Sequence, residues 1–285
     1  MAGDSNGSEI FAADLLAGRV ALVTGGGTGL GKATAIELAR CGASVTISGR
    51  REEVLEETVQ EMAAMSLDAN WVAGDVRDAA EARRVIGTVL ERDGRLDALV
   101  NNAGGQFFSP AELIAAKGWR AVWRLNVEGT LNMAEAAHEL AFLPAGGGTV
   151  VNVTLSPHHG MPGMAHSGSA RAAVEALTRE LAQRWRGDGI AVTAVAAGHF
   201  GTEVTAKYPE SVRAGAARSV PLQRLGEAVE HAWLVVLLCS PLAAAFSGST
   251  VTLDGARDNW FGPWPPAGLA DESGVVPSEA RRQLG

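Results

Sequence analysis

The sequence predicts an α/β fold in which a parallel sheet is covered by helices on both faces, a doubly wound arrangement. Short runs of β-branched and other apolar residues alternate with longer stretches whose apolar residues recur at helical spacing. The short runs are apolar almost throughout, which is typical of strands buried on both faces, and the longer stretches have room for helical crossovers. The length of 285 residues, with 47% hydrophobic and 20% charged residues, fits a single domain with tails.

Seven strands and at least five crossover helices follow from this pattern. The expected strands are 20–24, 45–48, 71–73, 96–100, 149–154, 190–196 and 250–253. The expected helices are 30–40, 52–65, 79–92, 119–141 and 170–186, and the apolar run 233–238 has the length of a turn or two of buried helix. Right-handed crossovers place the carboxyl ends of all strands at one edge of the sheet, where a ligand is expected.

The domain is expected to span residues 18–256. Residues 1–17 form an N-terminal extension, and residues 257–285 form a C-terminal tail that its aromatic residues anchor in part. The first eighteen residues lack a basic segment and a long apolar segment, so no signal peptide is indicated. No run of eighteen apolar residues follows, so we expect a cytoplasmic protein without a membrane partner.

Charge and cysteine usage exclude several classes of function. The net charge is −8 and no run of lysine or arginine occurs, which argues against a nucleic-acid partner. Cys41 and Cys239 lie far apart within apolar helical patterns, so reduced, buried thiols are expected in place of a disulfide. His158 and His159 are adjacent and have no metal-ligand spacing to other residues, so no metal site is expected.

A glycine-rich motif links the first strand to the first helix. Residues 24–31 have the sequence TGGGTGLG. Glycines at such a turn allow the backbone to approach a pyrophosphate, which the amino end of the following helix then attracts. The flanking strand and helix favour a Rossmann-type cofactor site over a glycine-rich turn without a ligand. The expected contacts are Gly25, Thr28, Gly29, Leu30 and Gly31.

The end of the second strand indicates the cofactor. Arg50 and Arg51 stand where an NAD enzyme would have an acid for the ribose 2′-hydroxyl. A guanidinium suits a 2′-phosphate, so NADP(H) is predicted. The alternative is that the two arginines begin a solvated helix that continues with Glu52 and Glu53.

Further motifs occur in the order of one large family. Asp75-Val76 follows the third strand, the sequence NNAG (101–104) follows the fourth, Asn126 lies in the next helix, and GHFGT (198–202) follows the sixth strand. Over residues 18–256 the chain therefore resembles the short-chain dehydrogenase/reductase family. The resemblance implies that Asp75 and Val76 contact adenine, that Asn102, Ala103, Gly104 and Gly198 support the cofactor, and that Thr202 meets the carboxamide.

The catalytic motif of that family is altered. Ser167 and Arg171 stand at the positions of the family's tyrosine and lysine. A serine hydroxyl has too high a pKa to act as an acid alone, and a guanidinium stays protonated, so the pair cannot repeat the usual proton transfer. The only tyrosine is Tyr208. The usual Pro-Gly after the sixth strand is Ala197-Gly198, and residues 154–156 (TLS) replace the expected serine.

Three segments, 102–112, 117–119 and 166–172, look most like the peroxisomal trans-2-enoyl-CoA reductases, whose neighbours, the 2,4-dienoyl-CoA reductases, also lack the standard motif. This resemblance implies conjugate reduction of an enoyl thioester, in which charge develops on the thioester oxygen as an enolate. Ser167, Ser156 and Thr154 are the expected hydrogen-bond donors, and Arg171 is expected at the nicotinamide ribose. The proton is expected from His166, His158 or water, and Asn126 is expected to fix backbone and water beside the cofactor.

Each candidate has a structural alternative. Ser167 is equally suited to cap a helix, the histidines to lie in loops, and Asn126 to be an ordinary polar group on an apolar helix. Three functions remain open: an NADP(H)-dependent enoyl-thioester reductase, a carbonyl reductase or alcohol dehydrogenase acting on a small or terpenoid substrate with Tyr208 as the acid, and an inactive nucleotide-binding member of the family.

Partners are suggested by one loop and two helices. Residues 205–224 hold Lys207, Arg213, Arg218 and Arg224 against Glu210. Such a basic segment suits an acyl-CoA substrate, although a solvated basic helix is the commoner explanation. Family members pair the helices here at 119–141 and 170–185 across a two-fold axis, so a homodimer or tetramer is expected.

Overall fold

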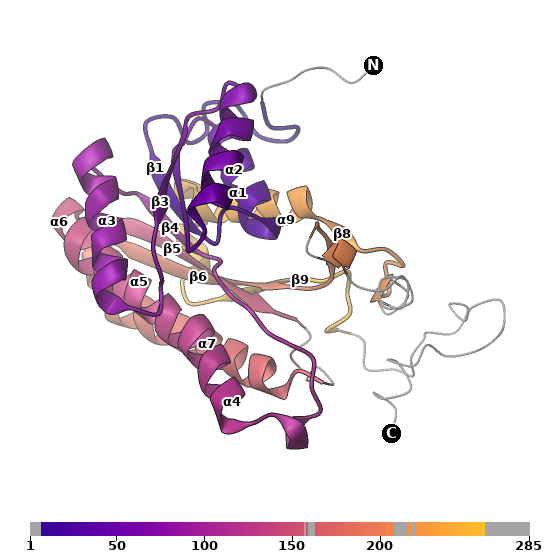
Figure 1. Cartoon of the computed structure of the whole chain (residues 1–285). Helices are drawn as coiled ribbons and strands as arrows, with labels where there is room; N and C mark the ends of the chain where they lie inside the picture. The colour runs from indigo at the N-terminus through magenta and orange to yellow at the C-terminus, as the bar shows by residue number, and fades with distance from the viewer. Residues whose placement is uncertain are drawn as a thin grey trace, which may run out of the picture.

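The computed structural model describes residues 7–156, 158, 163–203, 205–207, 216–217 and 220–259. Its seven-stranded sheet has the order β3-β2-β1-β4-β5-β6-β9, and every neighbouring pair of strands is parallel (Figure 1). The predicted Rossmann-type, doubly wound single domain is confirmed. The strands are β1 (Val20–Thr24), β2 (Ser44–Gly49), β3 (Ala69–Ala73), β4 (Ala98–Asn101), β5 (Gly148–Leu155), β6 (Ile190–Ala197) and β9 (Thr250–Leu253).

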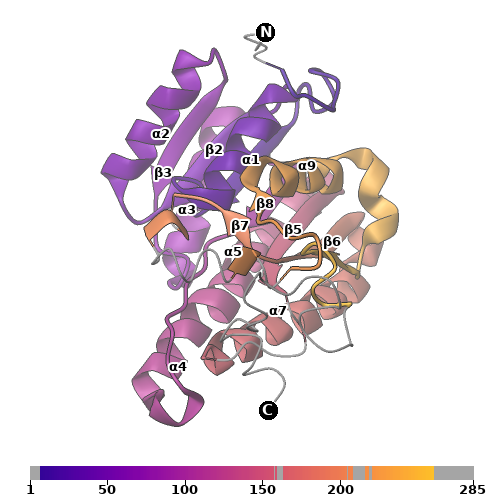
Figure 2. The ribbon, with the colours of Figure 1, turned by 90° about the vertical axis from the view of Figure 1, so that its right-hand side faces the viewer.

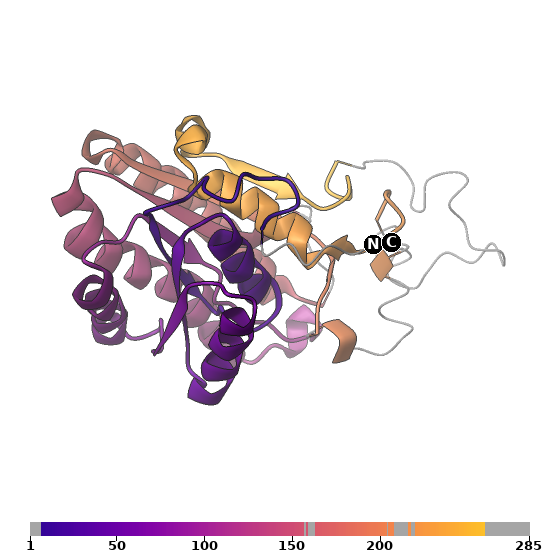
Figure 3. The same ribbon diagram turned by 90° about the horizontal axis from the view of Figure 1, so that it is seen from above.

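Helices cover both faces of the sheet. One apolar cluster joins a face of the sheet to α1, α2 and α9, and a second cluster joins the other face to α3, α5 and α7. Figure 3 shows α9 in orange beside α1 in indigo on the same side. The helices are α1 (Gly29–Arg40), α2 (Glu52–Ala64), α3 (Ala79–Asp93), α4 (Ala116–Trp123), α5 (Gly129–Ala137), α6 (Leu143–Ala145), α7 (Ala165–Arg184) and α9 (Ala228–Cys239).

The long helix expected at 119–141 is divided in the structure. It begins earlier, at Ala116, and π-helical turns at Arg124–Glu128 and His138–Phe142 separate α4, α5 and α6. The first π turn buries Asn126, whose amide donates to the Val122 carbonyl oxygen at 2.8 Å. Sequence periodicity did not indicate this change of helical pitch, which is common at functional sites.

Helix α7 begins at Ala165, five residues before the predicted start. The residue at its N-cap position is Met164, and Ser167 lies buried inside the first turn. The alternative that Ser167 caps the helix is therefore wrong, and its hydroxyl instead donates to Gln106 Oε1 at 3.1 Å.

The two cysteines are free and buried, as predicted. Burial raises the pKa of Cys41 to about 11 and that of Cys239 to about 12, so neither thiol is reactive at neutral pH. No helix among the described residues is long and apolar enough to span a bilayer. The domain boundaries at 18 and 256 stay predictions, and the aromatic residues of the tail, from Trp260 on, lie outside the described residues.

Candidate active site

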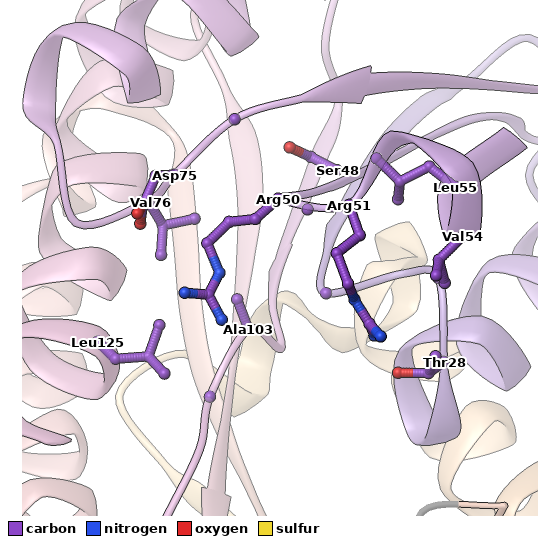
Figure 4. Close-up of a pocket in the computed structure, with 15 residues that line it drawn as sticks. Thr28, Ser48, Arg50, Arg51, Val54, Leu55, Asp75, Val76, Ala103 and Leu125 are labelled. Carbon is purple, nitrogen blue, oxygen red and sulfur yellow. The ribbon is translucent and has the colours of Figure 1, made fainter. Parts of the chain in front are cut away.

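A cleft opens at the carboxyl ends of β1, β2, β3 and β4 (Figure 4). These strands are neighbours in the sheet, so four loops that are distant in sequence meet there. Leu125, from the first π turn, closes one side. The lining residues from the strand ends and α2 are Gly25, Gly27, Thr28, Ser48, Gly49, Arg50, Arg51, Val54, Leu55, Gly74, Asp75, Val76, Ala103 and Gly104.

The glycine-rich loop is held from the neighbouring β4 loop. Thr24 Oγ1 accepts hydrogen bonds from the amides of Asn102 and Ala103, both at 3.0 Å. In return, Asn102 Nδ2 donates to the Thr24 carbonyl at 3.0 Å. Gly25 has a φ of +65°, and a Cβ at Gly31 would collide with the Gly25 carbonyl. The loop is thus fixed as an open turn beside the amino end of α1, with Leu30 in the first turn of that helix.

Both arginines that follow β2 extend into the cleft. Figure 4 shows the Arg50 guanidinium directed toward Ala103 and Leu125, and the Arg51 guanidinium directed toward Thr28. Neither forms a salt bridge with a described residue, so both charges face the cleft. The interpretation that they only begin a solvated helix does not account for these directions.

Asp75 and Val76, which follow β3 closely, line the same cleft. Asp75 accepts two hydrogen bonds from Arg77 Nε, at 2.8 and 3.0 Å, which hold its pKa below the usual value. Val76 is buried, and its carbonyl accepts from Asn132 Nδ2 at 2.9 Å. The carboxylate is therefore already paired, and Val76 supplies an apolar wall.

Asn126 fixes the loop after β4. Its Nδ2 donates to the Gly105 carbonyl at 2.9 Å, and its Oδ1 accepts from the Gly105 amide at 3.3 Å. These paired hydrogen bonds hold the residue that precedes Gln106. The sequence motifs assign no role to Gln106, although it lies within the segment 102–112, and the hydrogen bond that it accepts from Ser167 places it in the site.

Arg171 reaches the same loop beside Asn126. Its Nη1 donates to the Val153 carbonyl at 2.8 Å, and a Cβ at Gly104 would collide with Nη2. Burial lowers the pKa of Arg171 to about 10, so the group stays protonated at neutral pH. No described carboxylate forms a salt bridge with it. A partly desolvated cation without a counter-ion is costly unless a ligand supplies negative charge.

His166 lies in an aromatic wall. Its ring centroid is 4.3 Å from that of Phe107 and 6.0 Å from that of Trp119. The side chain is buried, and burial lowers its pKa, so the neutral form dominates at neutral pH. A neutral imidazole is a poor proton donor, which argues against His166 as the immediate acid.

The other hydroxyl and histidine candidates belong to an acidic network. Ser156 Oγ donates to Asp254, and Thr154 Oγ1 donates to Glu175 Oε1 at 3.1 Å. His158 contacts the same Glu175 oxygen through Nε2 at 2.9 Å, and its Nδ1 contacts Asp258.

Two opposing influences act on His158. Burial disfavours its charge, but the hydrogen bond to Asp258 and the charge of Glu175 outweigh burial and raise its pKa. Both ring nitrogens are thereby engaged, which leaves no N–H for a substrate. The sequence analysis did not identify the acids of this network, Glu175, Asp254 and Asp258. Of these, only Glu175 could have been found from helical spacing, because it lies four residues after Arg171 on α7.

The segment after β6 lies near the glycine-rich loop. Gly198 packs against Asp254, where a Cβ would collide, and Thr202 forms a turn with Thr205, whose Oγ1 accepts from the Thr202 amide at 2.7 Å. The small strands β7 (Phe200–Gly201) and β8 (Gly226–Glu227) pair beside this turn. Glu203 accepts a hydrogen bond from the Gly29 amide at 2.6 Å.

Part of the predicted basic segment is accounted for. Arg224 forms a salt bridge with Glu230 at 2.6 Å, so this charge is already paired, and the role of the segment in binding acyl-CoA stays a prediction. His159, Tyr208, Arg213 and Arg218 lie outside the described residues, as does the side chain of Lys207.

Comparisons with known proteins agree with this geometry. A family model described as Enoyl-(Acyl carrier protein) reductase matches residues 25–256. A peroxisomal 2,4-dienoyl-CoA reductase of Arabidopsis thaliana is 34% identical over 86% of this chain and 86% of its own length. A probable 2,4-dienoyl-CoA reductase of Bacillus subtilis is 36% identical over 87% of this chain and 98% of its own.

Solved structures give the same picture. A citronellol catabolism dehydrogenase of Pseudomonas aeruginosa has a TM-score of 0.79 and 38% identity over 87% of this chain and 98% of its own. A gluconate 5-dehydrogenase of Burkholderia cenocepacia, in complex with NADP and tartrate, has a TM-score of 0.81 and 28% identity over the same shares. The resemblance inferred from the motifs is confirmed.

Proposed function

Because the chain belongs to the short-chain dehydrogenase/reductase family and is an oxidoreductase of that family, we propose that it uses NADP(H) to reduce the C=C bond of an enoyl thioester of coenzyme A. The observation that carries the proposal is the altered catalytic slot. In place of a phenol and an amine, the slot holds the Ser167–Gln106 hydrogen bond and the protonated Arg171. Such groups stabilise negative charge on an oxygen but do not deliver a proton to it.

The cleft fits a dinucleotide phosphate. Its glycine-rich turn leaves no room for a Cβ at Gly31, and the guanidinium groups of Arg50 and Arg51 face the open space. When bound, the nicotinamide supplies hydride. The residues proposed to hold the cofactor are Gly25, Thr28, Gly29, Leu30 and Gly31 at the pyrophosphate, Arg50 and Arg51 at the 2′-phosphate, Asp75 and Val76 at adenine, and Asn102, Ala103, Gly104, Arg171, Gly198 and Thr202 toward the nicotinamide.

The protein's own contribution is to stabilise an enolate. Gln106 Oε1 accepts a hydrogen bond from the Ser167 hydroxyl, which orients the Gln106 amide group to donate to a thioester oxygen, and Asn126 holds the adjoining Gly105 in place. The fixed charge of Arg171 favours the same developing negative charge. His166 is neutral and His158 is engaged by two carboxylates, so water is the proposed source of the proton at Cα.

The test is an assay of NADPH consumption. We expect activity with crotonyl-CoA, longer 2-enoyl-CoAs or 2,4-dienoyl-CoAs, and none with a panel of aldehydes and ketones. A parallel titration of NADPH binding separates an intact cofactor site from an unsuitable substrate. Turnover of the carbonyl panel without turnover of any enoyl-CoA would overturn the proposal.

A second candidate function comes from one solved relative. The similarity to a citronellol catabolism dehydrogenase favours a terpenoid alcohol or aldehyde as the alternative substrate, and citronellol and citronellal therefore belong in the carbonyl panel. We also propose a homo-oligomer, because Trp123 on α4 is 43% exposed at a helix that family members use for assembly. Light scattering tests this, and a monomer mass would contradict it. The cytoplasmic location stays a prediction.

A further inference from the structure

The amino end of α1 has no cap of its own. Thr28 occupies the N-cap position but makes no side-chain capping hydrogen bond, and the first turn contains no acid. The first helical amide, that of Gly29, instead donates to Glu203 Oε1 at 2.6 Å, across 174 residues of sequence. A helix amino end attracts anions through its free amides and its dipole, and this one attracts a carboxylate from another loop.

Within the part of the chain that the structure describes, no cation explains the position of Glu203. Lys32, in the first turns of α1, forms a salt bridge with Glu61 on α2. Among the described residues Glu203 forms no salt bridge, and the hydrogen bond that it accepts there comes from the Gly29 amide. The carboxylate is thus held by the same feature, a free amide at a helix amino end, that binds phosphate groups in nucleotide sites.

Glu203 belongs to a small, internally bonded unit. Phe200 and Gly201 pair with Gly226 and Glu227, and the next turn is closed by bonds between Thr202 and Thr205. Figure 2 shows β7 and β8 on the side of the molecule that carries α1 and α9. A groove between this unit and α1 is lined by Gly29, Lys32, Ala33, Ile36, Gly201, Thr202, Glu203, Thr205, Ala206, Leu225 and Ala228.

We propose that Glu203 is an internal anion that occupies the pyrophosphate position at the amino end of α1 and is displaced when the dinucleotide binds. The inference rests on the cofactor site of the proposed function. Two anions cannot share one helix amino end at low cost, so binding must break the Glu203–Gly29 hydrogen bond. The unit that contains Glu203 and Thr202 then rearranges together with cofactor binding, and part of the binding free energy is spent on that change.

The experiment compares Glu203→Gln with the wild-type protein in the binding of two ligands. NADPH carries the pyrophosphate, whereas adenosine 2′-monophosphate ends before it. We expect the neutral variant to bind NADPH about fivefold more tightly and adenosine 2′-monophosphate with unchanged affinity, because only NADPH competes with the carboxylate. The matched control is Glu57→Gln, which removes an exposed carboxylate on the neighbouring helix α2 and should leave both affinities unchanged.

Hydrogen exchange gives a second readout. Before cofactor is added, the Gly29 amide should exchange faster in Glu203→Gln than in the wild-type protein, because its acceptor is weakened. Unchanged or weaker NADPH binding in Glu203→Gln, or equal gains for both ligands, would overturn the inference. Loss of enoyl-CoA turnover with the NADPH effect intact would overturn only the proposed reaction, whereas failure of every form to bind a dinucleotide would overturn both.

Discussion

Two regions at the carboxyl edge of the sheet differ in how their polar side chains are used. At the end of β2, Arg50 and Arg51 extend into the cleft without a salt bridge to any described residue. At the ends of β5 and β9, Ser156 donates to Asp254, and His158 lies between Glu175 and Asp258. The first region therefore presents unpaired charge to the cleft, whereas the polar groups of the second region are bonded to one another.

Arg171 lies where these two regions meet. It is a protonated side chain with a backbone partner, Val153, and no described carboxylate beside it. Glu175, one helical turn away, is already hydrogen-bonded to Thr154 and His158. The network at β5 therefore leaves Arg171 as an available positive charge, which makes this residue the sharpest test of the comparison.

The largest expected effect follows removal of the Arg171 charge. Arg171→Met should lower kcat for an enoyl-CoA about 100-fold, or about 3 kcal/mol, which is the usual loss when a group that stabilises developing charge is removed. Arg171→Lys keeps a positive charge, so its kcat should fall less than that of Arg171→Met. Thermal melting should show no loss of stability in Arg171→Met, since a desolvated cation is replaced by an apolar chain. A kcat within threefold of wild type would show that Arg171 is structural.

The next effect concerns the network itself. Ser156→Ala removes one of the donors to the buried Asp254 carboxylate, which keeps the Asp258 amide at 2.8 Å. We expect a loss of about 2 kcal/mol in the free energy of unfolding, measured by urea denaturation, with kcat changed little. The opposite result, unchanged stability with a large loss of kcat, would restore the role predicted for Ser156 from the sequence, that of a donor to substrate.

This contrast explains how much of the molecule the sequence could predict. The fold and the ends of most strands followed from apolar runs, since each strand carries its own signal. The loop residues 24–31 and Arg50 could be predicted to line the cleft because the chemistry that each offers is visible in its own residue type. Roles that depend on a partner were not located: Ser167 needed Gln106, 61 residues away, and Ser156 needed Asp254, 98 residues away.

The prediction of two helix boundaries was wrong for a related reason. The start of α7 at Ala165 and the π turn around Asn126 depend on packing and on hydrogen bonds to Gly105 and Val122, which the local sequence does not contain.

The open region is tested by cofactor preference. NADPH should bind at least about tenfold more tightly than NADH, equivalent to about 1.4 kcal/mol, because Arg50 can pair with the 2′-phosphate. Arg50→Asp should remove this preference by repelling the 2′-phosphate, and Arg51→Ala shows whether the second guanidinium contributes. Equal affinity for the two cofactors in the wild type, or an unchanged preference in Arg50→Asp, would contradict the assignment.

The smallest expected effect is a pH dependence of stability at His158. Its pKa is raised in the folded protein, since the hydrogen bond to Asp258 and the charge of Glu175 together outweigh the opposing influence of burial. A raised folded pKa gives stability that is complete below the unfolded value, near 6.5, and that is lost as pH rises through the folded value. The side chain is 32% exposed, so solvent screening reduces the contribution.

The wild type should therefore melt higher than His158→Gln near pH 6, by on the order of 1 °C, and this advantage should shrink toward pH 9. Glutamine keeps hydrogen-bonding groups but has no proton to lose, so it is the matched variant. An advantage that grows with pH would mean that neutral His158 is the stabilising form. In that case the carboxylates of Glu175 and Asp258 would not stabilise a protonated His158. The charges at the end of β5 would then not be internally paired, and the contrast with the unpaired arginines at the end of β2 would be contradicted.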